Sequence, residues 1–230
     1  MRRLLVALLL LAAACTPRIV VPDAERERAR AELAGKRRFL RVAVYEAPLF
    51  GDDGKLMLLA APPGEVDLLR TAGGEIVPPP APLRVLPPGT PVVVEQVEFP
   101  TGMTIALRVV TTPRYHPWAY LRIADDPRPH VVVLSQTDAT ADQVIAELEQ
   151  VLTSDDPTAA YQALPEDQRA AVLRKGLVEG MGTRAVAMAW GLPERIRMDR
   201  PADTEVWRWP GDQRRAEFLD GKLVRWDRKP

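Results

Sequence analysis

The stretch GMGTRAVAMAWGLP, residues 180–193, decides how the C-terminal third of the chain folds. A run of helix-compatible residues follows Gly182, and Gly191 with Pro193 ends it, because glycine favours the left-handed position after a helix and proline cannot continue one. A phosphate-binding loop would need a strand before its glycines and a Lys or Ser/Thr that completes the site. The sequence lacks that combination, so the pattern predicts a short helix capped by Gly182 or Thr183.

The segments on either side of this helix predict the rest of a small α+β unit. Upstream, PEDQRAAVLRKG (165–176) has the acidic start and basic end of a helix, and Gly176 suits its C-terminus. Downstream, four short strand-like runs are separated by the turn sequences RPAD, PGDQ and DG: ERIRMDR, TEVWRWP, RRAEFLD and KLVRW. Residues 165–230 therefore read as two helices followed by an antiparallel meander.

Several residues in this unit carry a resemblance to a family. Gly180-Met181 is followed by Val186-Ala187-x-Ala189-x-Gly191-x-Pro193, then by Trp207-x-Trp209 and an FLDGKLV hairpin. Residues 165–226 resemble the BamE-like (SmpA/OmlA) domain of outer-membrane assembly lipoproteins. Gly182 stands where that family usually has a Ser or Thr cap, and Trp209 where it often has Tyr. The resemblance implies an αα-βββ domain that docks, without catalysis, on other proteins of the cell envelope.

The first residues predict export and lipid attachment. Residues 2–15 read RRLLVALLLLAAAC, the charged, apolar and small-residue order of a secretory signal, too short to span a bilayer. Because the small residues end on Cys15, the segment resembles a bacterial lipoprotein signal, although Ala12 replaces the usual Leu. We expect palmitate-type lipid on Cys15 and, because Thr16 rather than Asp follows it, an outer-membrane lipoprotein facing the periplasm. The alternative is an ordinary signal followed by a free, buried cysteine.

Composition excludes several classes of function. The 31 basic and 31 acidic residues cancel, which argues against nucleic acid as a partner. Cys15 is the single cysteine, so no disulfide or thiolate metal site can form within the chain. The 23 prolines favour β-rich structure with rigid loops, and about 215 mature residues suggest two modest domains.

The middle of the chain predicts a β-rich domain between polar segments. Residues 16–38 read as a charged tether, a solvated helix or spacer whose basic residues could alternatively touch lipid head groups. Residues 136–164 read as a helical connector, with a cap at Asp138 or Thr140 and a second helix start at Asp156-Pro157. Between them, residues 39–135 contain short runs with a period of two: FLRVAVYEA, KLMLLAA, EVDLLRT, PVVVEQVEF, TIALRVVTT and WAYLRI.

This spacing predicts a small β-barrel or sandwich. LPPGTPVVVEQVEF followed by PWAYLRI is similar to bacterial Src-homology-3-like barrels. The aromatic group Tyr115, His116, Trp118 and Tyr120 could line a peptide or glycan groove there, or could contribute to the core by strand alternation. The binding alternative would make the protein a peptidoglycan- or peptide-binding module that acts through its β-rich domain.

The residue types of catalysis are sparse. Only Ser135 and Ser154 follow the signal as serines, His116 and His130 are the two histidines, and GxSxG and HExxH patterns are missing from the sequence. The Asp pairs at 52–53, 125–126 and 155–156 stand beside Gly or Pro, where turns and caps use Asp. We therefore expect no enzyme, no cofactor and no metal site.

Two tryptophans raise the question of which sheet face is functional. Trp207 and Trp209 are two apart on one predicted strand and share a face, which we expect to be buried under the helices. Arg208, Arg214 and Arg225 are then candidates for the opposite, partner-facing side. The leading hypothesis is an interaction or assembly module of the cell envelope, bound to the membrane through lipid.

Overall fold

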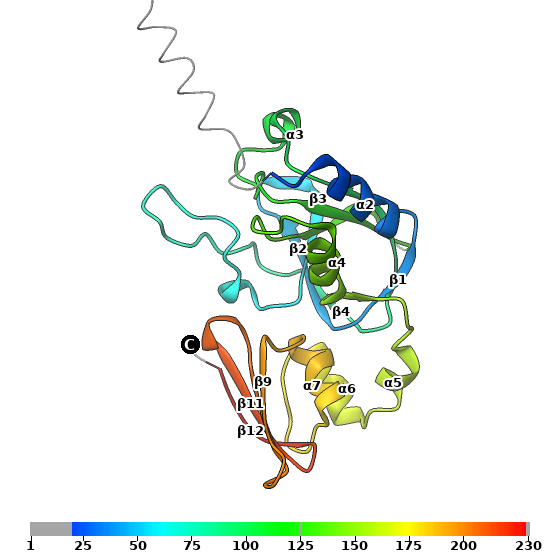
Figure 1. Cartoon of the computed structure of the whole chain (residues 1–230). Coiled ribbons are helices and arrows are strands. Elements are labelled where there is room, and N and C mark those ends of the chain that lie inside the picture. The colour runs from blue at the N-terminus through cyan, green and yellow to red at the C-terminus, as the bar shows by residue number, and fades with distance from the viewer. Residues whose placement is uncertain (1–19, 125, 229–230) are drawn as a thin grey trace, which may run out of the picture.

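The computed structural model describes residues 20–124 and 126–228, which form two sheets and six α-helices (Figure 1). The predicted α+β class is confirmed. The lipid-attachment residue Cys15 and the rest of the signal lie outside the described residues. Among the residues described, no helix combines the length and apolar character that crossing a bilayer would require.

The large-sheet region, residues 20–153, comes first along the chain. Its helices are α2 (Asp23–Leu33), α3 (Gly102–Leu107) and α4 (Ala141–Glu149), with a 3₁₀ turn at Pro63–Glu65. Its strands are β1 (Arg37–Leu40), β2 (Val44–Leu49), β3 (Asp52–Leu59), β4 (Arg84–Leu86), β5 (Pro91–Glu98), β6 (Trp118–Ile123), β7 (Asp126–Val133) and β8 (Leu152–Thr153).

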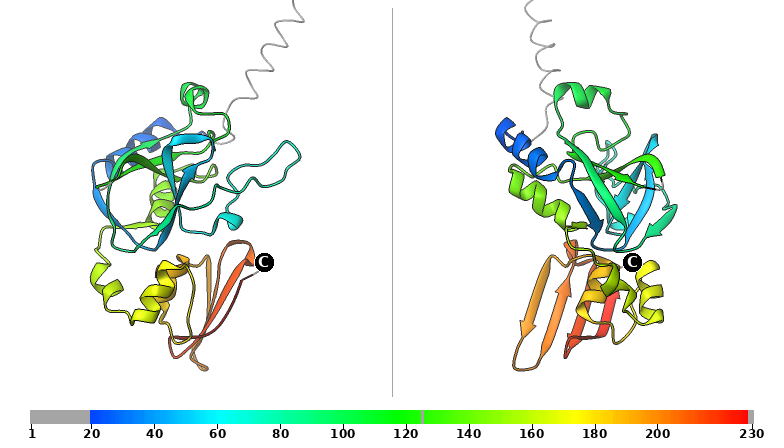
Figure 2. Two further views of the ribbon diagram at one scale, coloured as in Figure 1. Left: turned by 180° about the vertical axis from the view of Figure 1, so that it is seen from behind. Right: turned by 90° about the vertical axis from the view of Figure 1, so that its right-hand side faces the viewer.

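These eight strands form one sheet in the order β4-β2-β3-β7-β6-β5-β1-β8. The sheet is curled (Figure 2). The long pairings are antiparallel, as between β5 and β6, whereas β3 and β7 run parallel with Leu56 opposite His130. Within the part of the chain described, β4 and β8 remain the two ends of the sheet rather than closing it. The predicted barrel-like domain is thus a curled, open sheet.

The predicted tether and connector belong to this region. Ala29 and Leu33 of α2 are buried in the same core as Val144 and Leu148 of α4. Glu25 of α2 also accepts a hydrogen bond from the first backbone N–H of α4 at 2.7 Å. The stability of a short helix comes mainly from such packing of its apolar side chains against neighbouring elements. Over its described part, the segment 16–38 is therefore a packed helix rather than a solvated spacer. The segment 136–164 contains the helices that were predicted for the connector, and the first of them, α4, packs in the core of the large-sheet region.

Three predicted strands also differ from the structure. The run 39–47 is divided between β1 and β2, and the run 65–71 lies in a long loop that projects from the sheet. The run 104–112 is not a strand, because Thr101 and Thr104 cap each other's backbone N–H groups and begin α3. This capping box outweighs the β-branched residues that made the run resemble a strand.

The small-sheet region, residues 158–228, carries three helices and four strands. Its helices are α5 (Thr158–Gln162), α6 (Glu166–Leu173) and α7 (Thr183–Trp190). The strands form an antiparallel meander in the order β12-β11-β10-β9: β9 (Arg195–Asp199), β10 (Thr204–Arg208), β11 (Arg214–Leu219) and β12 (Lys222–Arg228). The αα-βββ pattern that the resemblance implies therefore has a fourth strand here.

The stretch 180–193 folds as a helix with its stop signals. α7 begins after Gly182, which serves as the N-cap residue without a side-chain bond, and ends at Gly191 with φ 85° and ψ 174°. Positive φ at Gly191 was expected from its place between a helix and Pro193, and is confirmed. α6 and α7 lie together against one face of the small sheet (Figure 2).

The two regions are joined by buried polar contacts. The Lys175 ammonium, 4% exposed as a residue, donates to the Ala43 carbonyl at 2.6 Å and to the Ala60 carbonyl at 2.9 Å. Arg214 and Arg228 both pair with Glu65, at 2.9 and 3.1 Å. The junction is thus fixed by charge and backbone groups as well as by apolar packing.

Candidate functional site

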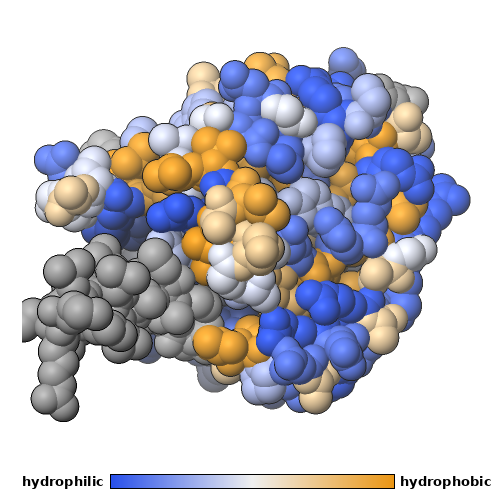
Figure 3. Space-filling view, turned by 90° about the horizontal axis from the view of Figure 1, so that it is seen from above, coloured by the Kyte–Doolittle hydropathy of each residue, from blue (hydrophilic) through white to orange (hydrophobic). Residues whose placement is uncertain are grey.

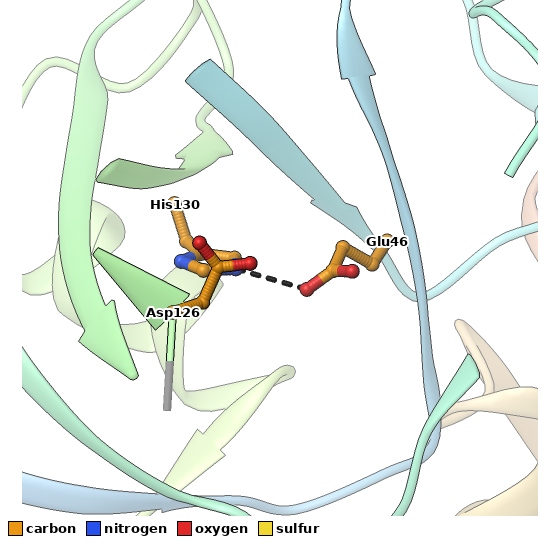
Figure 4. A group of neighbouring side chains, drawn as sticks. All are labelled: Glu46, Asp126 and His130. Carbon is orange, nitrogen blue, oxygen red and sulfur yellow. Dashed lines mark hydrogen bonds and ion pairs between the residues drawn. The ribbon is translucent and has the colours of Figure 1, made fainter. Parts of the chain in front are cut away.

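A cluster of buried ionisable side chains lies in the large sheet (Figure 4). Glu46 on β2 and His130 on β7 reach across β3, with Glu46 Oε1 2.9 Å from His130 Nε2. Asp126 lies beside them at the start of β7, and the ligand atoms of all three lie within 4.8 Å of one another. The exposed fractions are 1%, 0% and 8%. By residue type and spacing, this cluster could hold a cation.

The charges around the cluster oppose that use. Arg84 donates twice to Glu46, at 2.6 and 2.9 Å, and Arg128 donates to both oxygens of Asp126 at 3.0 and 2.7 Å. Burial alone would raise the pKa of Glu46, but the hydrogen bonds from Arg84 and His130 keep that pKa below its usual value. The Arg128 hydrogen bond likewise lowers the pKa of Asp126. With both carboxylates neutralised by arginine, the cluster is a structural ion network rather than a ready metal site.

The second candidate is the aromatic face of the small sheet, which proves to be core. Trp207 is 6% exposed and Trp209 1%, so the expected burial of Trp207 is confirmed. The Trp207 ring lies 5.0 Å from Phe218, and Trp209 meets Trp190 of α7 edge-on at 5.2 Å. Such tilted and edge-on pairs add to the burial of apolar area. These rings hold α7 to the sheet.

The remaining residues of the quoted pattern have structural places. Met181 and Val186 are fully buried, and Gly180 has φ 78° and donates its N–H to the Leu223 carbonyl. Pro193 lies after the turn at Gly191 and lines a cavity of about 350 Å³ at the junction of the two regions. The pattern thus defines how the helix is attached to β12 and β10, and not a ligand site.

The three candidate arginines of the outer face do not lie together. Arg208 and Arg225 are exposed on that face, and Arg208 pairs with Asp212 at 3.2 Å. The prediction that Arg214 lies on the outer face is wrong. Arg214 is 3% exposed, because it lies on the same inner face as Ala216, two residues along the strand. Its guanidinium lies 5.2 Å from the Trp209 ring. Burial lowers the pKa of Arg214, and its partner Glu65 opposes that shift.

The most exposed apolar element of the small sheet is β9. All five of its residues are exposed, including Ile196 at 50% and Met198 at 59%. Ile196 lies opposite Trp207, so its side chain continues the inner apolar face beyond the area that α7 covers. Over the described residues β9 has a neighbour only in β10, and its other edge is open.

The opposite edge of the same sheet is protected. Segment 180–182 lies along the start of β12, where the Gly180 N–H donates to Leu223 and the Leu223 N–H donates to Met181, both at 2.8 Å. A bridge between Gly182 and Lys222 extends this contact. Over the described residues, the β12 edge is therefore covered at its start, whereas the β9 edge is open along its whole length, and an open edge is a template for another strand.

A groove of about 420 Å³ lies at the junction, next to Trp207 of β10. Ala187 and Met188 of α7 line it, together with charged side chains of the large-sheet region, of the segment between the regions and of α7: Arg41, Asp155, Asp156 and Arg184. This volume is in the range of clefts that accept a small ligand or a few side chains. Trp207 lines the groove and pairs with Ile196, so one strand, β9, separates the groove from the open edge.

The aromatic group of the large sheet is divided between core and surface. Trp118 is 1% exposed, stacks under the Arg108 guanidinium at 3.7 Å and donates to the Pro113 carbonyl, so its place on a binding face is corrected. His116 is also buried. Tyr115 and Tyr120 are half-buried, and burial raises the pKa of Tyr120 to about 12.

Comparison of the chain with family models, with curated proteins and with solved structures finds no significant match. The BamE-like and Src-homology-3-like resemblances therefore stay predictions. Sequence reasoning missed the Glu46 cluster and the open edge of β9. Glu46 could have been noticed as the single charge within the apolar run VAVYEAPL. No sequence signal distinguishes β9 from β12 as the uncovered edge, because the cover comes from residues forty positions earlier in the chain.

Proposed function

We propose that this protein is an outer-membrane-anchored periplasmic lipoprotein that acts, without catalysis, as a protein-interaction or assembly module of the cell envelope. We assign the binding site to the open edge of β9 together with the nearby groove. The observation that carries the proposal is the exposure of Ile196 and Met198 on a strand whose neighbour, Trp207, is buried. Monomeric proteins usually cover or shorten such an edge.

An extended segment of a partner would add a strand beside β9. Main-chain hydrogen bonds supply affinity in this mode of recognition, and alternate side chains supply specificity. Ile196 and Met198 offer apolar contacts on one face, while Arg195 and Arg197 lie on the other. The arginines favour acidic residues opposite them and discourage pairing of two copies of β9.

The place where the described chain begins is consistent with membrane attachment at the end of the molecule opposite the small sheet. The described chain begins at Val20, beside the loop that carries α3, whereas the small sheet forms the opposite end of the molecule (Figures 1 and 2). A lipid on Cys15 would place β9 away from the bilayer, where a periplasmic protein or the periplasmic part of a membrane protein can reach it. Radiolabelled fatty acid should enter the wild-type chain and not Cys15→Ala; equal labelling of both would contradict the lipid anchor.

The binding site is tested by photocrosslinking in intact cells. A benzophenone amino acid in place of Ile196 or Met198 should give specific adducts with envelope proteins. The same amino acid in place of Val224, which is 47% exposed on β12 at the opposite edge of the sheet, is the matched control. The proposal fails if positions 196 and 198 give no more adduct than position 224. Ile196→Asp and Met198→Asp should abolish the adducts formed from the other position without lowering the melting temperature.

A second candidate function is binding of peptidoglycan or peptide by the large-sheet region. The observation that favours it is a cavity of about 320 Å³ lined by the half-buried Tyr120 with Lys55 and Glu98. Sedimentation with purified peptidoglycan distinguishes the two functions. Sedimentation of wild type that is lost in Tyr120→Ala would favour this candidate, and adducts with β-barrel assembly proteins from β9 would favour the first.

A further inference from the structure

The loop that carries α3 is an exposed apolar surface at the end of the molecule where the described chain begins. Four of its side chains are largely exposed: Met103 at 70%, Leu107 at 77%, Val109 at 41% and Val110 at 73%. Residues 99–112 read FPTGMTIALRVVTT, and the single charge in that run, Arg108, is 8% exposed. A solvent-facing helix normally carries polar residues on its outer face, so this one lacks the expected cover.

The loop is held firmly in this exposed position. The Arg108 guanidinium donates to Glu98 and to the carbonyls of Arg114 and His116, the latter two at 2.9 and 2.6 Å. Ile105 is 4% exposed and anchors the inner side of α3. Since the base of the loop is fixed by buried polar contacts, the exposure of Met103 and Leu107 is a property of the fold and not of a frayed segment.

The beginning of the described chain lies at the base of this loop. Val20, itself 63% exposed, and Val21 line one small cavity together with Phe99, Pro100 and Tyr115. Figure 3 views the molecule from this end and shows apolar residues gathered in patches within a hydrophilic surround. Cys15 precedes Val20 by five residues. Five residues span at most about 18 Å, so a lipid on Cys15 holds this end close to the bilayer.

We propose that the α3 loop inserts Met103, Leu107 and Val110 into the interfacial layer of the membrane that holds the lipid anchor. This inference rests on the proposed lipidation of Cys15. The loop is a second, non-covalent attachment that fixes the orientation of the protein on the bilayer and directs β9 away from it. Because the exposed residues of the loop carry no charge, the insertion depends on apolar contact rather than on anionic head groups.

The test uses the full chain as the cell processes it, purified and reconstituted into phosphatidylcholine vesicles. Because Cys15 is the single cysteine, Met103→Cys introduces one site for a polarity-sensitive NBD probe once Cys15 is acylated. Met198→Cys is the matched control, since Met198 is 59% exposed at the opposite end of the molecule. The fluorescence emission of the probe at position 103 should shift to shorter wavelength and be quenched by lipids with spin-labelled acyl chains. The emission of the probe at position 198 should show neither change.

The outcomes separate the two proposals. NBD labelling of the wild-type chain would mean a free Cys15 thiol, which contradicts the lipid anchor. An unlabelled wild type together with equal, water-like spectra at 103 and 198 would overturn the insertion of the loop. A blue shift at 103 that requires added envelope protein would also overturn it, and would assign the loop to a protein partner. Raising the salt concentration should leave the signal at 103 unchanged, and Leu107→Asp should reduce its quenching on the order of tenfold.

Discussion

The two sheets of this protein bury different chemistry. The large sheet curls around a core that includes ionic groups, with Glu46 and His130 both essentially inaccessible. The small sheet packs one face on aromatic rings and exposes the whole of β9. In the large region, arginines pair with the buried carboxylates of Glu46 and Asp126, while the described part of the small region leaves apolar side chains and the edge of β9 without cover. This difference is the reason why we propose β9 as the binding edge, and why we expect loss of a buried carboxylate to destabilise the large sheet.

The largest effect is expected in the aromatic core. Trp207→Ala should lower the free energy of unfolding by about 3–5 kcal/mol, because a buried ring is replaced by a cavity between α7 and the sheet. Trp226 provides a matched control, since it lies in the same cross-strand row through Ala216 but is 37% exposed. Trp226→Ala should cost about 1–2 kcal/mol. The measurement is urea denaturation followed by tryptophan fluorescence.

An unchanged denaturation midpoint for Trp207→Ala would contradict the assignment of Trp207 to the core of the small-sheet region. If that variant also lost its adducts with envelope proteins, the tryptophan face would be a binding surface rather than core. The crosslinking at Met198 would then report a larger interface than the edge of β9.

The next largest loss of stability is expected from a substitution in the buried ionic cluster of the large sheet. Glu46→Ala leaves His130 and Arg84 without their carboxylate, and removal of one partner from a buried pair costs about 3 kcal/mol. Glu95→Ala is the control, because Glu95 and Arg122 form a pair in which both side chains are about half exposed. Its cost should be about 0–1 kcal/mol. Equal costs for the two variants would mean that the buried network does not stabilise the fold.

The sequence predicted local structure better than it predicted packing. The helix 183–190, its stop at Gly191 and the four-strand meander follow from residues close together in the chain, and they were found. The burial of α2 against α4 joins residues more than a hundred positions apart, and so does the contact between Lys175 and Ala43. Neither leaves a periodic pattern at one place in the sequence. The α3 loop was misread because its alternating apolar residues favour a strand, whereas the capping box of Thr101 and Thr104 begins a helix.

The turn at Gly191 is one of the local features that the sequence predicted, and a substitution there tests it. A Cβ at this position would meet only the Ala60 Cβ at 3.9 Å, so space is available. The backbone, with φ 85° and ψ 174°, lies in a region that residues other than glycine essentially avoid. Gly191→Ala should therefore cost about 1–3 kcal/mol in free energy of unfolding, and Gly191→Val should cost more. Gly102→Ala, where a Cβ would meet no atom within 4 Å and φ is not positive, should leave the midpoint unchanged.

The smallest expected effect is the pH dependence of the free energy of unfolding that Lys175 contributes. Lys175 joins the two regions through its hydrogen bonds to the Ala43 and Ala60 carbonyls. Burial, with a further contribution from Arg214, lowers the pKa of Lys175 to about 7, against about 10.4 in an unfolded chain. Between these values the unfolded chain binds a proton that the folded chain does not, so the free energy of unfolding rises with pH, by at most about 1.4 kcal/mol per pH unit.

Glu147 in the large region has the opposite effect at lower pH. Burial, and then Asp138, raises its pKa to about 8, so its contribution to stability is lost as the pH rises through that value. The Lys175 slope should consequently be measured between about pH 8 and 10, by urea denaturation at constant ionic strength. Lys175→Met should flatten the slope of the wild-type chain, while Lys222→Met, which alters an exposed lysine on β12, should preserve it. Parallel slopes for wild type and Lys175→Met would show that the ammonium at the junction stays protonated, held by the carbonyls of Ala43 and Ala60.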